Sequence, residues 1–226
     1  MMLKPSRKIL KKEIKKDPFL ETFEKIENGF EENRKTLINV FIFFVAIIVL
    51  GSIYINNQRV AELESSSAFG AALVAYSNLD FDNAKFQFES ISSTYEGTES
   101  EIFSKYYLGK IAFEMGNFNE AKLLLNDFLD NTEKAIFVCG AIKQLVDISF
   151  SENDFLKSLD IIARAKNFNI NNISKLELEL LRINALINLN DLQSAKIEIA
   201  KILNSKNVPS SIEQKINEFE GLLSVL

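Results

Sequence analysis

The spacing of apolar and polar positions divides the chain into three segments. Residues 1–36 are rich in charge, residues 37–55 are almost entirely apolar, and the remainder shows apolar positions three to four residues apart, which is typical of helices with one buried face. None of the three prolines lies between residues 19 and 208, and the whole chain holds only eight glycines. Because proline and glycine are the residues that most often interrupt a helix, the pattern predicts an all-α protein.

The apolar run at residues 37–55 is predicted to be a transmembrane helix. No charged residue lies between Lys35 and Arg59, and nineteen helical residues extend for about 28 Å, close to the ~30 Å hydrocarbon thickness of a bilayer. Fourteen of the nineteen are Leu, Ile, Val or Phe. They contribute roughly −4 to −8 kcal/mol to the apparent free energy of insertion, which outweighs the polar Asn39 near one end.

Two other interpretations of this run are weaker. A cleaved signal peptide has an apolar region of about 7–15 residues behind a short basic head, whereas this run is longer and follows 36 residues. A buried core helix that is apolar on every side requires a far larger domain. We therefore expect a retained single-pass anchor.

The charges that flank the run predict its orientation. The twenty residues before it contain Lys25, Arg34 and Lys35, and the twenty after it contain only Arg59. Because the flank richer in Lys and Arg stays in the cytoplasm, the amino terminus is expected to be cytoplasmic and the carboxy-terminal body exported. In a Gram-negative bacterium the body then lies in the periplasm, and the protein in the inner membrane.

Within the basic tail, residues 1–36, a short amphipathic helix is predicted. Asp17 can cap it, with Pro18 at its first position. Such a helix beside a membrane lies on the headgroups or packs against a neighbouring membrane protein; a solvated tether is the alternative. The residues that would share its apolar face are Phe19, Leu20, Phe23, Ile26 and Phe30.

After the anchor, one hydrophobic pattern recurs four times. Each copy has an Asp or Asn at a turn, an apolar residue directly after it, and a small residue three positions further on. Every one of these series advances by 37 residues. The copies are Asp80, Phe81 and Ala84; Asn117, Phe118 and Ala121; Asp154, Phe155 and Ser158; and Asp191, Leu192 and Ala195.

A fixed period of 20–50 residues is the signature of a solenoid. Each unit reads as a helix, a capped turn, a second helix and a linker, and the small residue lets the two helices approach closely. One pair cannot bury its apolar face, but four stacked pairs over residues 60–205 can. Residues 209–226 are then predicted to form a capping helix that starts at Ser210 or Ser211.

The composition argues against several function classes. Histidine is absent, which removes the commonest general base and the commonest zinc ligand. The single cysteine, Cys139, lies in an apolar run and is expected to be a small core residue. Residues 59–226 carry a net charge of −8 against +3 for residues 1–36, and an acidic body does not suit nucleic acid. No phosphate loop, serine elbow or ligand cluster is found, so we expect no catalytic residue, cofactor, metal or small-molecule substrate.

The repeats resemble the tetratricopeptide repeat (TPR), whose usual period is about 34 residues. The second unit matches best, and the first keeps Ala72, Phe81, Ala84 and Phe88. The third and fourth units depart from the pattern, since Val146 and Ile183 stand where a small residue belongs and Arg182 where leucine belongs. The matching residues of the second unit are Leu108, Gly109, Gly116, Phe118, Ala121 and Leu125.

The layout as a whole resembles the YfgM-type ancillary subunits of the bacterial SecYEG translocon. A basic head ending in EENRK precedes one anchor, then an array entered by SSSAFGAALVAY, and the linker YEGTE is similar to the YPGT common there, with Glu96 in place of proline. The resemblance implies a periplasmic TPR domain beside the translocon that works with periplasmic chaperones on emerging exported polypeptides.

We therefore expect a non-enzymatic protein that binds other proteins. An envelope or cell-division scaffold that binds one folded partner is the alternative. By TPR geometry, the first helix of each pair lines the concave side, where aromatic residues suit apolar or extended polypeptide segments; packing within the superhelix is the competing role for each. The predicted groove residues are Phe69, Leu73, Tyr76, Tyr106, Lys110, Phe113, Lys143, Asp147, Phe150, Leu180, Asn184 and Ile187.

Overall fold

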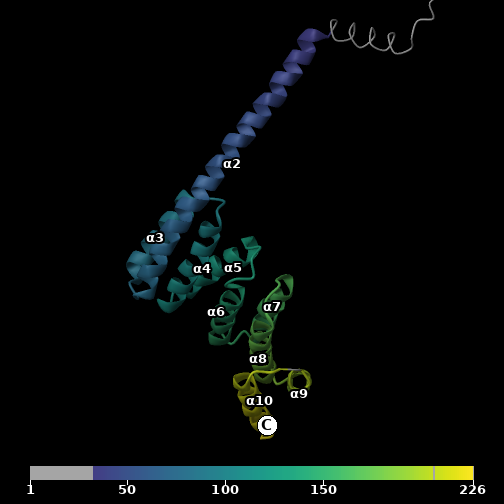
Figure 1. Cartoon of the computed structure of the whole chain (residues 1–226). Coiled ribbons are helices and arrows are strands. Elements are labelled where there is room, and N and C mark those ends of the chain that lie inside the picture. Colours follow the sequence, from purple (N-terminus) through teal and green to yellow (C-terminus); the bar gives the residue numbers. More distant parts are fainter. Residues whose placement is uncertain (1–32, 206, 226) are drawn as a thin grey trace, which may run out of the picture. The chain divides into compact units, whose positions relative to one another are not determined.

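The computed structural model describes residues 33–205 and 207–225, and within these residues it contains helices and no strand. The all-α prediction is confirmed; the amphipathic helix predicted around Asp17 lies outside the described residues. Figure 1 shows the order of the elements. They are α2 (Arg34–Ser77), α3 (Phe81–Thr94), α4 (Glu99–Glu114), α5 (Phe118–Asn131), α6 (Val138–Ser151), α7 (Phe155–Ala163), the 3-10 turn η1 (Arg164–Asn167), α8 (Asn172–Asn188), α9 (Leu192–Leu203) and α10 (Ser210–Leu223).

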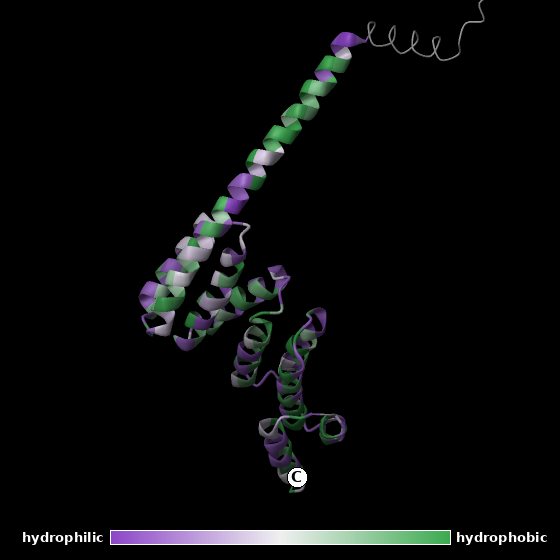
Figure 2. Cartoon of the chain, viewed as in Figure 1, coloured by the Kyte–Doolittle hydropathy of each residue, from purple (hydrophilic) through white to green (hydrophobic). Residues whose placement is uncertain are grey.

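The described part of the chain divides into two compact units after Asn57. In the first unit, α2 carries the predicted membrane segment, and its side chains from Leu37 to Ile55 are exposed. Helix α2 is long and apolar enough to cross a membrane. Figure 2 shows the apolar stretch as a nearly continuous hydrophobic colour along this part of the helix.

The second unit contains the predicted array of helix pairs. The carboxy-terminal part of α2 packs on α3. The pairs α4–α5, α6–α7 and α8–α9 follow, and α10 packs on both α8 and α9 as the predicted cap. The small residues of the repeat, Ala84, Ala121, Ser158 and Ala195, are completely buried. Because a side chain no larger than serine occupies each site, the two helices of a pair lie close together, as the sequence predicted.

All four turns between paired helices share one backbone structure. The residue before each helix cap has a left-handed conformation: φ is 61° at Leu79, 77° at Gly116, 56° at Asn153 and 58° at Asn190. The next residue donates its backbone N–H to a carbonyl five positions back, as in Asp80 to Ala75, at 2.8–3.1 Å in the four copies. This is the Schellman ending of a helix, repeated every 37 residues.

The residue that ends each turn is also the cap residue of the following helix. The side chains of Asp80, Asp154 and Asp191 accept the backbone N–H three residues later, whereas Asn117 makes no such bond. A side-chain cap of this kind stabilises a helix by about 1 kcal/mol. The predicted turns capped by Asp or Asn are therefore confirmed in three of the four copies; in the second, Asn117 makes no cap bond and the turn has Gly116 at its left-handed position.

Leu79 provides a test of this turn. A residue with a Cβ pays roughly 1–2 kcal/mol in the left-handed region, and Leu79 is 73% exposed, so its side chain contributes little burial. We expect Leu79→Gly to raise the free energy of unfolding by about 1 kcal/mol, measured by urea denaturation of the full chain in mild detergent. Gly116→Ala is the matched control and should lower it by a similar amount. A lower stability for Leu79→Gly would show that this side chain has a packing role.

A candidate protein-binding groove

The predicted groove residues all come from the first helix of each pair and form three rows. Each member of a row lies 37 residues after the previous one. The rows occupy successive turns of α2, α4, α6 and α8. The first row is Phe69, Tyr106, Lys143 and Leu180; the second is Leu73, Lys110, Asp147 and Asn184; the third is Tyr76, Phe113, Phe150 and Ile187.

The residues of the third row join the two helices of each pair at the turn between them. The ring of each aromatic member meets the ring of the first residue of the next helix, with centroids 5.6 Å apart for Tyr76–Phe81, 5.7 Å for Phe113–Phe118 and 5.4 Å for Phe150–Phe155. In the fourth pair, Ile187 and Leu192 pack against the same apolar cluster. These residues therefore hold the turn of each pair together, whatever else they contact.

The first two repeats contribute a cluster of tyrosines, Tyr76, Tyr106 and Tyr107, which we call the tyrosine cluster. Tyr107 meets Tyr76 edge-on with centroids 5.2 Å apart and stacks on Phe88 at 5.1 Å. Tyr106 is only 6% exposed and stacks on Phe137 with centroids 4.8 Å apart and ring planes 9° apart. The cluster therefore joins α2, α3, α4 and the linker before α6.

Lys110 lies over the tyrosine cluster. Its Nζ is 5.2 Å from the ring centroid of Tyr76, 5.8 Å from Tyr106 and 5.9 Å from Tyr107, within the range of a cation–π interaction. No carboxylate among the described residues lies within ion-pair distance of this amine. Burial raises the pKa of both Tyr106 and Tyr107, which disfavours the phenolate form of these two side chains.

The last two repeats present a more polar surface in the same rows. Lys143 pairs with Glu177 at 3.5 Å, Asp147 is exposed, and Asn184 accepts a bond from the side chain of Asn188 at 3.0 Å. The predicted groove residues are therefore mainly aromatic in the first two repeats, whereas half of them are polar in the last two. Leu180 is half-buried and packs against the cluster of the fourth pair.

Cys139 lies beside this polar end. Its side chain is half-buried against the main apolar cluster, and its Sγ is 3.8 Å from a carboxylate oxygen of Glu177. Burial is the largest influence on the pKa of the thiol, which lies above its ordinary value. A thiol with a raised pKa is a poor nucleophile. Cys139 packs at the edge of the cluster, however, and is not the fully buried core residue that the sequence predicted.

Glu101 is a buried acidic residue near the start of α4. It is 8% exposed, accepts the backbone N–H of Gly97 at 3.3 Å and pairs with Lys105 at 2.6 Å. Burial works against a charged Lys105, but its bonds with Asp127 and Glu101 raise its pKa overall. Glu101 thus links the start of α4 to the preceding turn and to Lys105. Among the described residues, no group of three His, Cys, Asp or Glu side chains could hold a metal ion.

Three aromatic residues that contact predicted groove residues were not predicted from the sequence: Phe103, Tyr107 and Phe137. Phe103 contacts Phe69 and Phe137, with centroids 6.2 and 5.3 Å apart. It lies one helical turn before Tyr106, so extending the three rows by one turn would have found it. Phe137 belongs to the linker before α6, where the repeat pattern gives no expectation.

Comparison with known families identifies the array. Residues 29–196 match the model of the tetratricopeptide repeat-like domain. The chain belongs to this family. Domains of this family are typically non-enzymatic modules for protein–protein interaction, so the family match indicates a protein-binding array. No curated protein and no solved structure gives a significant match.

Proposed function

We propose that this chain is a non-enzymatic, single-pass inner-membrane protein whose array lies in the periplasm and binds polypeptides. The tyrosine cluster with Lys110 carries the proposal, because its half-buried members, Tyr76 and Tyr107, offer apolar surface beside one charged donor within a protein-binding family. The length and composition of α2 support the anchor. The excess of Lys and Arg before the apolar run supports a cytoplasmic amino terminus.

The groove suits an extended segment of polypeptide. Apolar side chains of the segment would contact ring faces of Phe69 and Tyr76, and Lys110 would donate hydrogen bonds to a backbone carbonyl or a carboxylate. The ring contacts already made within the protein hold these side chains in place, which lowers the conformational entropy lost on binding. The polar third and fourth repeats would take a more hydrophilic part of the same segment.

The layout of basic tail, anchor and array supports a more specific place for the protein. We propose an ancillary subunit of the Sec translocon or a component of the periplasmic chaperone network, with nascent exported polypeptides as its clients. The alternative is an envelope or cell-division scaffold that holds one folded partner. The two differ in what the groove contacts in living cells.

In-cell photo-crosslinking from the groove tests these proposals. With a photoreactive amino acid at Leu73, we expect adducts with translocon subunits and with several exported proteins. The control position is Glu89, on the second helix of the same pair, where the side chain is 53% exposed; it should give few adducts or none. Mild-detergent purification from native membranes identifies the partners.

The outcomes separate the alternatives. One folded envelope protein as the sole adduct would support the scaffold, and adducts confined to cytosolic proteins would overturn the orientation. Equal yields from Leu73 and Glu89 would overturn the groove as the binding surface.

A further inference from the structure

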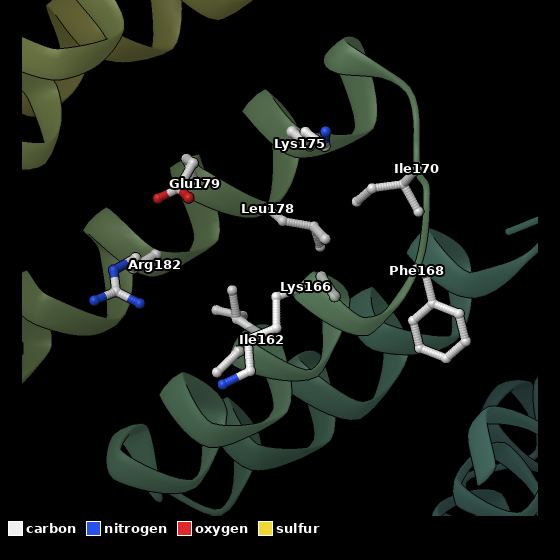
Figure 3. Close-up of a pocket in the computed structure, with 10 residues that line it drawn as sticks. Ile162, Lys166, Phe168, Ile170, Lys175, Leu178, Glu179 and Arg182 are labelled. Atoms are coloured by element: carbon white, nitrogen blue, oxygen red, sulfur yellow. The ribbon is translucent and has the colours of Figure 1, made fainter.

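A cavity lies between the third and fourth repeats, apart from the groove residues (Figure 3). Its volume is about 490 Å³, within the roughly 300–1,000 Å³ of ligand pockets. Figure 3 shows side chains of α7 and η1 facing those of α8 across the cavity, with the connecting segment closing one end. The lining residues used below are Ile162 and Lys166, Phe168 and Ile170, and Lys175, Leu178, Glu179 and Arg182.

The preceding repeat fills the corresponding space with apolar side chains. There the residues 37 positions earlier form part of one buried cluster: Phe128, Leu129, Val138, Ile142 and Leu145 are at most 4% exposed. Their counterparts between the third and fourth repeats are Ala165, Lys166, Lys175, Glu179 and Arg182. Of five positions that are apolar and buried in the preceding repeat, four thus carry a charged residue here and the fifth carries alanine.

The backbone has changed at the same place. Helix α7 ends at Ala163 after nine residues, whereas α3 and α5 have fourteen. The chain then forms the 3-10 turn η1 and an extended segment from Phe168. The last turn of the second helix is therefore wound as a tighter 3-10 turn, and the cavity lies between this turn and α8.

The lining has a charge opposite to that of the array. Three cations, Lys166, Lys175 and Arg182, and one carboxylate, Glu179, line the cavity, in a unit whose net charge is −8 over residues 59–226. Within the described residues, neither Lys166 nor Lys175 forms an ion pair. Arg182 lies 3.6 Å from Glu198. One oxygen of Glu179, Oε2, is buried without a hydrogen-bond partner.

We propose that this cavity binds a polypeptide segment that carries a carboxylate beside an apolar side chain. The apolar side chain would lie against Ile162, Ile170 and Leu178, and the carboxylate would pair with the cations of the rim. The unpaired lysines and the net positive lining of an acidic protein favour an acidic occupant. The choice of a polypeptide as the occupant rests on the proposed protein-binding function of the array. The proposal of this cavity as a site does not depend on the groove or on the translocon.

Fluorescence anisotropy of labelled peptides tests the chemistry. The probe is a fluorescein-labelled ten-residue peptide of alternating leucine and glutamate. The protein is the full chain in phosphatidylcholine nanodiscs, with empty nanodiscs as the blank. We expect saturable binding of this probe. A leucine–lysine peptide and a serine–glutamate peptide should each bind at least about tenfold more weakly, because each lacks one of the two contacts.

Variants locate the site. Lys166→Glu with Lys175→Glu should weaken binding of the probe by about tenfold or more. Lys157→Glu with Lys196→Glu is the matched control, since it makes the same change of net charge at exposed lysines outside the cavity, and it should leave the affinity nearly unchanged. Ala163→Phe, which places a ring at the cavity wall, should also weaken binding. Unchanged melting temperatures establish that the variants are folded.

Three results would overturn the inference. The first is equal affinity in the cavity and control variants, and the second is no binding to the wild-type chain. The third is displacement of the probe by decanoate well below the peptide's own Kd, which would make a small carboxylate the occupant. Lys110→Glu separates this inference from the proposed function: if it abolishes binding and the cavity variants do not, the groove binds the peptide and the cavity does not.

Discussion

Replacing Ala121 by arginine is expected to unfold the array, and it should have the largest effect of any substitution considered. Ala121 is fully buried, and it packs in one cluster with Ala112 and Ile148, where three helices meet. Overfilling such a site costs about 1–3 kcal/mol, and burying an unpaired charge adds several kcal/mol more. The sum is comparable to the 5–15 kcal/mol by which typical domains are stable.

Thermal denaturation of the full chain in mild detergent, followed by circular dichroism, measures this effect. Ala84→Arg makes the same change in the first pair, where Ala84 is also fully buried, and should behave alike. Glu96→Ala alters an exposed linker residue and should leave the melting temperature unchanged. Helix α2 will keep part of its helical signal, so the informative quantity is the cooperative loss of the remainder. Equal melting temperatures for Ala121→Arg and the wild type would refute the role assigned to this position.

The fold could be predicted because the repeat contains residue types with strong local preferences. An Asp or Asn at a helix start and a small residue at a helix crossing recur every 37 residues, so each copy supports the others. The periodicity placed α3, α5, α7 and α9 at their observed starts. It could not reveal that Leu79 adopts a left-handed conformation, because leucine gives no such signal, whereas Gly116 and Asn190 at the equivalent positions do.

The groove was predictable only in part, because helical spacing identifies a face and not the depth of each side chain. Tyr106 and Tyr107 are adjacent, and both are aromatic. Only the structure shows that Tyr106 is the more deeply buried of the two. Whether the predicted groove residues contact a partner remains a prediction. The cavity beside Arg182 was visible in the sequence only as a departure from the repeat. Its origin in the early end of α7 depends on the backbone and not on any motif.

The remaining large effect concerns Gly140, which makes room for Tyr106. A Cβ on Gly140 would lie 2.4 Å from the Tyr106 hydroxyl oxygen and 3.3 Å from the ring carbon that bears it. Alanine normally stabilises a helix relative to glycine by about 1 kcal/mol. At this position, however, we expect Gly140→Ala to lower the free energy of unfolding by about 1–3 kcal/mol, because Tyr106 must shift off Phe137. Gly70, also helical and with open space at its Cβ, is the matched control, and Gly70→Ala should stabilise.

A double-mutant cycle decides whether the hydroxyl is the cause. Tyr106→Phe removes the oxygen that clashes, and in that background Gly140→Ala should cost much less, leaving a coupling free energy of at least about 1 kcal/mol. Urea denaturation of the four proteins provides the measurement. Because Tyr106 also lies under Lys110, Gly140→Ala alone should reduce crosslinking from Leu73, and the double variant should restore it. If Gly140→Ala lowers the free energy of unfolding by as much in the Tyr106→Phe background as in the wild type, the added methyl group clashes with another neighbour. The hydroxyl of Tyr106 then does not require glycine at this position.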